Sequence, residues 1–288
     1  MPSILLTGVC TLDIINQVES YPEQDSEVRA VSQQIRNGGN ACNMAIVMQQ
    51  LGLVTHLLAR RADDSNASLI FSQLEQRQIG TSLCPTQSNS STPTSYITLN
   101  RENGSRTIVH YRNLDELDAA HFTQLDLSSF DWLHFEARNC LQLLKMLKHC
   151  RTYNKPVSIE LEKPRDAIDE IISEATVLLI SKPFANFYGF NNAIDCLDYY
   201  SKLYPDKIIT CTWGDQGAWA YFQSQIIHQP AIKLARPLET IGAGDTFNAA
   251  FISSLIQQMP VSESLKFACQ LAGKKCTQSG FDHLLTSG

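Results

Sequence analysis

The most constraining feature of this chain is an alternation of apolar strand-like runs with amphipathic helical segments between residues 132 and 212. The apolar runs are nearly continuous, which is typical of strands buried on both faces of a parallel sheet. We expect strands at Trp132–Glu136, Val157–Leu161, Val177–Ile180 and Ile208–Thr212, and helices at Leu141–Tyr153, Arg165–Glu174 and Ala193–Leu203. The alternation predicts an α/β fold, with a mostly parallel central sheet covered by helices on both faces.

The first part of the chain follows the same pattern. We expect strands at Ile4–Val9 and Val54–Ala59, a helix beginning at Asn40 and a second helix over Asn66–Gln78. The 288 residues include 43% hydrophobic side chains, enough for one substantial core. We therefore expect residues 1–288 to form a single α/β domain.

Two stretches interrupt the alternation. Ser95–Leu99 and Arg106–His110 are strand-like and are joined around Asn103-Gly104, a pair favoured in hairpin turns. The segment Glu19–Ile35 is polar and alternates only loosely. Neither stretch belongs to a βαβ unit, so both are free to form a separate small sheet.

We predict that this sheet is a lid over a site, formed by about residues 14–37 and 93–113. A purely decorative edge hairpin is the alternative. A lid sheet carries an apolar face that needs cover, so we also predict a homodimer formed through the lid.

Composition excludes several classes of protein. The net charge is −6 and Lys and Arg form no basic run, so we expect no nucleic-acid partner. No apolar run approaches the ~20 residues needed to cross a bilayer, so we expect no membrane association. The nine cysteines include no Cys-x-x-Cys pair, which favours reduced thiols in a cytoplasmic protein.

The segment Thr240–Phe247 is the strongest functional motif. It places Gly242, Gly244 and Asp245 at the start of a segment with helical apolar spacing. The free N–H groups and the positive dipole end of such a helix bind anions, and glycine lets a phosphate approach the backbone closely. A carboxylate beside an anion is unfavourable unless it has a role, and Asp245 is suited to deprotonate a hydroxyl that attacks a phosphate.

Other interpretations of this loop are weaker. An ordinary capped turn at a helix start remains open. A dinucleotide-binding fingerprint would need a third glycine where Phe247 stands. Such a fingerprint also follows the first strand of the fold, whereas this loop lies near the C-terminus. The Walker pattern is absent, since Gly273-Lys274-Lys275 lies late in a helical stretch without the upstream glycine.

Polar residues near strand ends and helix starts suggest a polyol site. Ligands of open α/β sheets gather at the carboxyl ends of the strands. Carboxylates and amides there can take sugar hydroxyls as donors or acceptors. The candidates are Asp13, Asp25, Asn40, Asn43 and Arg106. Each alone has a structural alternative, such as a turn or helix cap, but their joint placement favours a polyol pocket.

A second glycine loop, Gly214-Asp215-Gln216-Gly217, follows the strand Ile208–Thr212. Two glycines at a strand exit permit a tight loop against a flat or phosphorylated ligand. A simple turn between two strands is the alternative.

The motifs together resemble a known family. Gly38–Ala45 and Thr240–Phe247 are similar to the two signature regions of the ribokinase-like, or PfkB, carbohydrate kinases, and the resemblance extends over the whole chain. Further segments resemble its ketose-phosphorylating members, namely Tyr21–Arg29, Ser105–Val109, Glu160–Arg165, Ala272–Cys276 and Gly280–Asp282. The resemblance implies a ribokinase-like three-layer sandwich with a β-sheet lid. It also implies ATP-dependent phosphorylation of a sugar hydroxyl, O1 of a fructose-like ketose.

The resemblance also implies roles for individual residues. Asp245 would be the catalytic base, and the backbone amides of Gly242, Ala243 and Gly244 would form an anion hole. The sugar-binding residues that it implies are Asp13, Gly39, Asn40, Asn43, Arg106 and, reaching from the lid or from a partner subunit, Asp25. The ATP-binding residues that it implies are Arg106, Lys182, Gly214, Asp215, Gln216, Gly217, Gly244 and Cys269.

The cation sites depart from the family pattern. Many relatives carry Asn-x-x-Glu where this chain has Lys182 and Ala185, so Mg²⁺ support through water is expected from Glu160 or Glu162. K⁺ is a further candidate cation, but Glu239 stands where relatives often have Asp at the potassium site, which makes a dependence on monovalent cations doubtful.

The segment His110–Asn113 also differs from the pattern expected of ketose kinases. This region lines the sugar pocket in the family, so ribose, a modified hexose or a nucleoside are alternative acceptors. The missing Asn-x-x-Glu leaves a further alternative, a non-catalytic sugar or nucleotide sensor.

Overall fold

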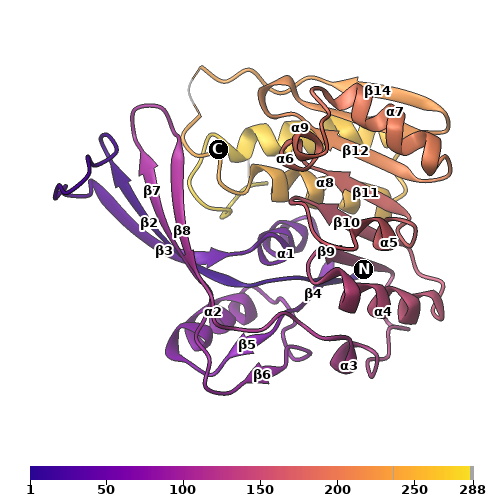
Figure 1. Cartoon of the computed structure of the whole chain (residues 1–288), viewed down its shortest axis with the longest axis horizontal. Helices are drawn as coiled ribbons and strands as arrows, with labels where there is room; N and C mark the ends of the chain where they lie inside the picture. The colour runs from indigo at the N-terminus through magenta and orange to yellow at the C-terminus, as the bar shows by residue number, and fades with distance from the viewer. Residues whose placement is uncertain (236, 286–288) are drawn as a thin grey trace.

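The computed structural model describes residues 1–235 and 237–285, which are built around an eight-stranded sheet (Figure 1). The strand order is β14-β13-β12-β11-β10-β9-β1-β4. All neighbouring pairs from β4 to β12 are parallel, and only the edge strands β13 and β14 join antiparallel. The bounds are β1 Ser3–Thr7, β4 Val54–Leu58, β9 Trp132–Glu136, β10 Val157–Leu161, β11 Val177–Ile180, β12 Ile208–Thr212, β13 Ala218–Phe222 and β14 Gln225–Gln229.

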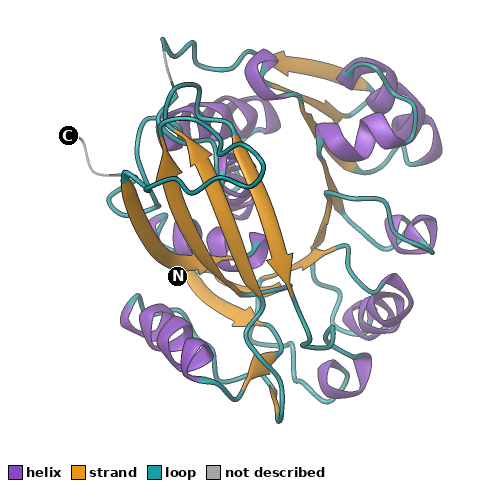
Figure 2. Cartoon of the chain, turned by 60° about the vertical axis from the view of Figure 1, so that its left-hand side comes forward, coloured by secondary structure: helices purple, strands orange, loops and turns teal. Residues whose placement is uncertain are grey.

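Helices cover both faces of this sheet, which confirms the predicted three-layer sandwich (Figures 1 and 2). Side chains alternate along each strand, so Ile4 and Leu6 of β1 pack in one core and Leu5 packs in the other. The first core is completed by α1 Asn40–Gln50, α2 Ser65–Gln76, α8 Ala243–Ile256 and α9 Val261–Lys275. The second is completed by α3 Ala119–Phe122, α4 Cys140–Arg151, α5 Ile168–Ile172, α6 Lys182–Phe187 and α7 Ala193–Leu203.

A separate four-stranded sheet stands at one side of the sandwich, in the order β3-β2-β7-β8 (Figure 2). The predicted hairpin is confirmed, since β7 and β8 pair antiparallel. The first strand of this sheet begins at Thr11, so Asp13 lies within the sheet and not in a loop after β1. The bounds are β2 Thr11–Val18, β3 Ser32–Gly38, β7 Thr94–Asn100 and β8 Arg106–Tyr111, and a third sheet pairs β5 Arg61–Ala62 with β6 Thr86–Gln87.

Two local predictions differ from the structure. The helix expected over Arg165–Glu174 is only α5, because Pro164 and the left-handed residue Ala167, with φ 58°, keep the preceding segment out of the helix. The hairpin β13–β14 was not anticipated. Its two-residue turn, Gln223-Ser224, has positive φ at both positions without Gly or Asn, so the usual sequence signal is missing.

Within the described residues, no helix combines the length and the apolar character needed to span a membrane. The helix starts that matter for function are those of α1 and α8, which pack against each other. Both begin at the carboxyl edge of the parallel strands, where open α/β sheets bind ligands.

Candidate active site

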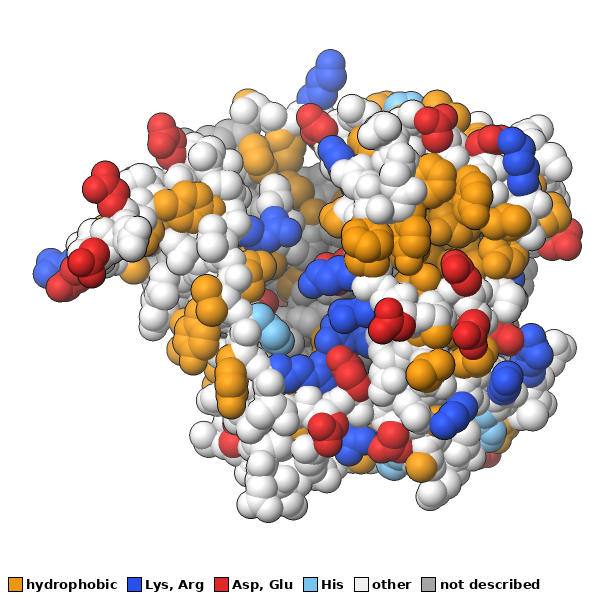
Figure 3. Space-filling view, in the orientation of Figure 1, with side chains coloured by type: hydrophobic (Ala, Val, Ile, Leu, Met, Phe, Trp, Pro, Cys, Tyr) orange, Lys and Arg blue, Asp and Glu red, His pale blue; other side chains and the backbone are white. Residues whose placement is uncertain are grey.

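The candidate site lies at the carboxyl ends of β1, β9 and β10, beside the first turns of α1 and α8. A hollow between the small sheet and the sandwich opens there, and Lys and Arg side chains surround it (Figure 3). Residues far apart in the sequence therefore meet at one edge of the fold.

Asp245 is buried on the first turn of α8 and accepts a hydrogen bond of 2.6 Å from Asn43 Nδ2 on the first turn of α1. Burial raises the pKa of Asp245 from 3.8 to about 7, while the Asn43 hydrogen bond opposes the rise and the charge of Glu162 adds to it. A carboxylate with this pKa exists in both protonation states near neutral pH, as a general base requires.

The glycine loop before α8 is open toward this carboxylate. Gly242 has φ 77°, and the Phe281 ring lies where a Cβ would stand, with Cζ only 2.3 Å from that position. A Cβ on Gly244 would meet open space. Among the described residues, the N–H groups of Gly242 and Gly244 have no backbone acceptor, whereas Ala243 N–H donates to the Thr240 carbonyl at 3.3 Å. The loop thus offers the Gly242 and Gly244 amides without a backbone acceptor, beside an Ala243 amide that turns back to Thr240.

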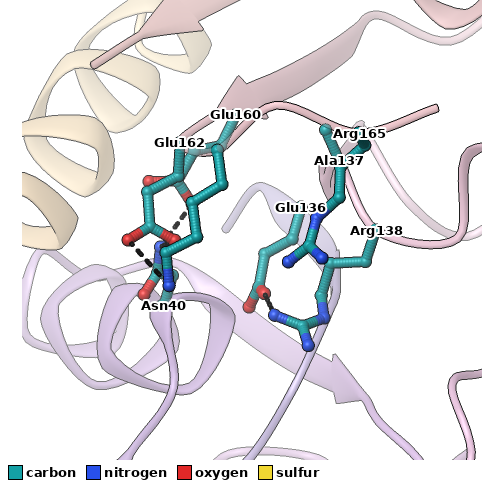
Figure 4. A pocket seen from close by; sticks show the side chains of 8 residues that line it. Asn40, Glu136, Ala137, Arg138, Glu160, Glu162 and Arg165 are labelled. Carbon is teal, nitrogen blue, oxygen red and sulfur yellow. Dashed lines mark hydrogen bonds and ion pairs between the residues drawn. The ribbon is translucent and has the colours of Figure 1, made fainter. Parts of the chain in front are cut away.

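Three further acids, Glu136, Glu160 and Glu162, line a small pocket (Figure 4). Asn40 Nδ2 donates to Glu160 Oε2 at 3.1 Å and to Glu162 Oε2 at 3.4 Å. Asn248 Nδ2 donates to Glu160 Oε1 at 2.9 Å. Burial, together with the charges of Asp245 and Glu136, raises the pKa of Glu160 well above its usual range.

No group of three or more Asp, Glu, His or Cys side chains in the described chain is arranged to hold a metal directly. Glu160 already has both oxygens bonded to amides, while Glu162 is only partly buried at the pocket mouth. This donor set fits Mg²⁺ held mainly through water and phosphate oxygens, which is its usual mode in phosphoryl-transfer sites.

Glu136, the last residue of β9, was missed in the sequence. Its Oε1 accepts from the backbone N–H groups of Val9, at 3.1 Å, and Ala41, at 2.7 Å. Gly8 makes room for it, since a Cβ there would lie 2.2 Å from the same oxygen. Burial raises the pKa of Glu136. Its position at the end of a predicted parallel strand was the signal that could have identified it.

Cations line the opposite wall of this small pocket. Arg138 bonds to Glu116 at 2.7 Å and lies 3.9 Å from Glu136. The lining side chains are Asn40, Glu136, Ala137, Arg138, Glu160, Glu162, Lys163 and Arg165. The pocket therefore combines acids, for a hydroxyl or hydrated metal, with guanidinium groups suited to phosphate.

The predicted sugar residues of α1 and the small sheet lie close together. Buried Asp13 accepts from Thr11 Oγ1 at 2.9 Å, and burial raises its pKa. A Cβ on Gly38 would be 2.2 Å from Asp13 Oδ2, and a Cβ on Gly39, with φ 96°, would be 2.3 Å from the Val9 carbonyl oxygen. Both glycines are thus needed for the small sheet to join α1 at this point.

Arg106 and Asp25, which the sequence also predicted for the sugar site, are both exposed. Arg106 is exposed, and its Nη1 donates to Thr240 Oγ1 at 2.9 Å, just before the glycine loop. Asp25 is exposed in the loop between β2 and β3, with φ 64°. Because β2 leads away from the sandwich and β3 leads back, this loop lies at the outer end of the small sheet (Figure 1). The fold of one chain does not bring Asp25 to the pocket.

Of the predicted nucleotide residues, Gly214–Gly217, Lys182 and Cys269 gather near the end of β12 and the start of β13, while Arg106 and Gly244 lie at the loop before α8 and its first turn. Gly214–Gln216 form a 3-10 turn, and a Cβ on Gly217, with φ 94°, would lie 2.1 Å from the Gln229 carbonyl oxygen. Cys269 Sγ of α9 lies 3.7 Å from that same oxygen. Lys182 Nζ lies 5.4 Å from the centroid of the Trp213 ring, next to the turn. These segments form one neighbourhood.

Comparison with known proteins gives consistent matches over the whole chain. The family model described as "pfkB family carbohydrate kinase" matches residues 1–286. Ketohexokinase of Mus musculus is 38% identical over 293 residues, covering 98% of each chain. Ribokinase of Bacillus subtilis (strain 168) is 25% identical over 274 residues, covering 94% of this chain and 92% of the relative.

Solved structures share the fold. Arabidopsis thaliana ribokinase, complexed with ribose and ATP, superposes with a TM-score of 0.77 at 19% identity, covering 97% of this chain and 94% of that one. This likeness supports the observed architecture.

The raised pKa of Asp245 predicts a pH-dependent stability. Because its pKa rises from 3.8 to about 7 on folding, its contribution to the free energy of unfolding is greatest below pH 3.8. That contribution is lost progressively as the pH rises to about 7. Asp245→Asn cannot ionise, so it should gain stability relative to the wild type between about pH 5 and pH 8. Urea unfolding of the wild type and of Asp245→Asn at about pH 5 and about pH 8 measures the difference in their free energies of unfolding.

The matched control is Asp206→Asn, which changes an exposed carboxylate. Its unfolding is measured at the same two pH values for comparison. An Asp245→Asn difference that is independent of pH would contradict the raised pKa.

Proposed function

Because the chain belongs to the pfkB family of carbohydrate kinases, we propose that it is an ATP-dependent sugar kinase that phosphorylates O1 of a fructose-like ketose. The observation that carries the proposal is the buried Asp245, bonded to Asn43 beside the open amides of Gly242 and Gly244. A base and an anion cradle in contact are what phosphoryl transfer to an alcohol needs. The 38% identity to ketohexokinase of Mus musculus favours a ketose as the acceptor.

In this proposal, Asp245 takes the proton of the sugar hydroxyl as the oxygen attacks the γ-phosphorus of ATP in line. The new O–P bond forms while the bond to the β-phosphate oxygen breaks, and ADP leaves with that electron pair. The amides of Gly242 and Gly244 stabilise charge on the transferring group. Glu160 or Glu162 would hold Mg²⁺ through water, and the bound ion would neutralise charge on the phosphates.

The substrates occupy the two neighbourhoods of the site. Asp13, Gly39, Asn40 and Asn43 bind the sugar, because their polar groups converge beside Asp245. Gly214–Gly217, Lys182 and Cys269 bind the nucleotide. The ribokinase of Arabidopsis thaliana, which shares this fold, is complexed with ribose and ATP. Arg106 reaches either the sugar or a phosphate from the strand β8. The small sheet acts as the lid over this site.

A different acceptor is the second candidate function. Arg112, just past β8, is fixed by bonds to Glu116 Oε1 at 2.7 Å and to the Leu114 carbonyl at 2.6 Å. In this proposal, the fixed Arg112 guanidinium alters the part of the sugar site that the lid forms, and with it the choice of acceptor. Ribose, a modified hexose or a nucleoside are the acceptors to compare, since a ribokinase is among the relatives. The open cradle beside Asp245 argues against a non-catalytic sensor.

We also propose a homodimer formed through the lid. Strand β8 is exposed along its whole length, including Val109 at 67%. By strand register, Ile35, Tyr96 and Tyr111 lie on the same face of the lid as Val109, with exposed Val31 just before β3. Ile108 pairs with buried Ile97 on the opposite face. A second copy would cover this face and could bring Asp25 of the partner subunit over the sugar.

All nine cysteines are free thiols, which fits a cytoplasmic enzyme.

Asp245→Asn should lower kcat with fructose and ATP by ~10²–10⁴-fold, because it removes the proposed base while keeping the shape of the side chain. Coupled detection of ADP measures the rate. Asp206→Asn is the control and should keep wild-type turnover. Near-full turnover of Asp245→Asn would reject Asp245 as the base.

A panel of acceptors should show the highest kcat/KM for a ketose. Fructose, ribose, an aldohexose and adenosine are each assayed with ATP and coupled ADP detection, and the position of the new phosphate is determined by NMR. A clear preference for ribose or adenosine would establish the second candidate. Tight sugar binding without ADP formation would favour the sensor.

Val109→Asp should dissociate the proposed dimer, because it places charges into a face that two lids would share. Light scattering across a concentration series measures the mass. Glu263→Gln, at an exposed position of α9 away from the lid, is the control. A wild type that is monomeric at working concentrations would contradict the dimer.

A further inference from the structure

Lys275 is a fully buried lysine at the end of α9, with 0% exposure. Its Nζ donates to Glu239 Oε1 at 3.1 Å and to the Gln278 carbonyl at 3.4 Å. Desolvation makes a buried ammonium costly unless it is paired, so this arrangement needs the carboxylate. The mechanism proposed above makes no use of either side chain.

Glu239 is the partner of two cations. Arg36 Nη2 of β3 lies 2.5 Å from Oε1, and Ser279 Oγ donates to Oε2 at 3.0 Å. Burial acts to raise the pKa of Glu239, but the hydrogen bond and charge of Arg36, with Lys275, bring it below its usual value. Glu239 is therefore an ionised carboxylate whose two oxygens are both occupied.

This ion cluster adjoins the glycine loop in two ways. Glu239 stands three residues before Gly242, and the backbone N–H of Leu238 donates to the Cys276 carbonyl at 2.8 Å. Lys275 Nζ also lies 5.3 Å from the centroid of the Phe281 ring, and that ring packs where Gly242 has no Cβ. A displacement of the ammonium would thus be transmitted to Gly242, the N-cap residue of α8.

A potassium ion, the further cation implied by the family, does not fit these residues. The Glu239 carboxylate already carries an ammonium and a guanidinium, which together exceed its charge. A third cation would be repelled and would find no vacant carboxylate oxygen. The fixed positive charge beside the loop is therefore supplied by the chain itself.

We propose that Lys275 is a positioning residue for phosphoryl transfer, whose buried ammonium holds Glu239 and Phe281 and thereby fixes the Gly242–Gly244 loop without a monovalent cation. This inference rests on the proposed kinase function, since its readout is turnover. It assigns Lys275 no contact with substrate.

The first test uses the wild-type enzyme. Turnover with the best acceptor of the panel is measured at constant ionic strength while KCl replaces tetramethylammonium chloride. We expect kcat to be the same in both salts. Strong stimulation by K⁺ would overturn the proposal, and this test does not depend on the folding of any variant.

The second test removes the ammonium. Lys275→Ala should lower kcat by about 10- to 100-fold with little change in KM, because small displacements of a catalytic loop have costs of this size. Methylammonium fits the space that the side chain leaves, and its addition should restore kcat in Lys275→Ala. Lys275→Met fills that space without a charge, so methylammonium should not restore it. Thermal unfolding verifies that the variants are folded.

Lys266→Met is the matched control, since Lys266 is exposed on the same helix. It should keep wild-type kcat. Unchanged kcat in Lys275→Met, or a loss that methylammonium leaves equal in both Lys275 variants, would reject the positioning role. Failure of the wild type to form ADP with any acceptor would instead reject the proposed function, so the two outcomes are distinct.

Discussion

The hydrogen bond between Asn43 and Asp245 is the interaction on which the rest of the site depends. It joins two residues 202 positions apart in the sequence, on the first turns of two packed helices, and it compensates part of the cost of burying a carboxylate. The cost that remains is expressed as a pKa of about 7. A better solvated or better bonded carboxylate would be more stable but a poorer proton acceptor at neutral pH.

Most of the architecture could be predicted from the sequence, because buried parallel strands are continuous apolar runs. Val157–Leu161 and Ile208–Thr212 were predicted with their observed bounds, and the family resemblance is confirmed. The hairpin β13–β14 could not be predicted, because its turn uses Gln223 and Ser224 at positive φ. In that case, pairing in the sheet outweighs the local preference of the turn residues.

The site was predictable where a motif concentrates its residues, as around Asp245. The contacts between distant segments were not predictable. The sequence positions of Arg36, Glu239 and Lys275 give no indication that these side chains pair. Glu136 and Asn248 fall between these cases. Glu136 is at the end of a predicted strand, and Asn248 is about one helical turn beyond Asp245. Only the three-dimensional arrangement shows that Glu136 binds the Ala41 amide and that Asn248 binds Glu160.

Two arginines from different strands of the lid bind the segment that leads into the glycine loop. Arg36 of β3 holds Glu239, and Arg106 of β8 holds Thr240. A lid that lifts away would release both residues, and the cradle for the phosphate would lose its support at the same moment. In the proposed kinase, such a linkage would leave ATP unreactive toward water whenever no acceptor holds the lid down, and would so limit futile hydrolysis.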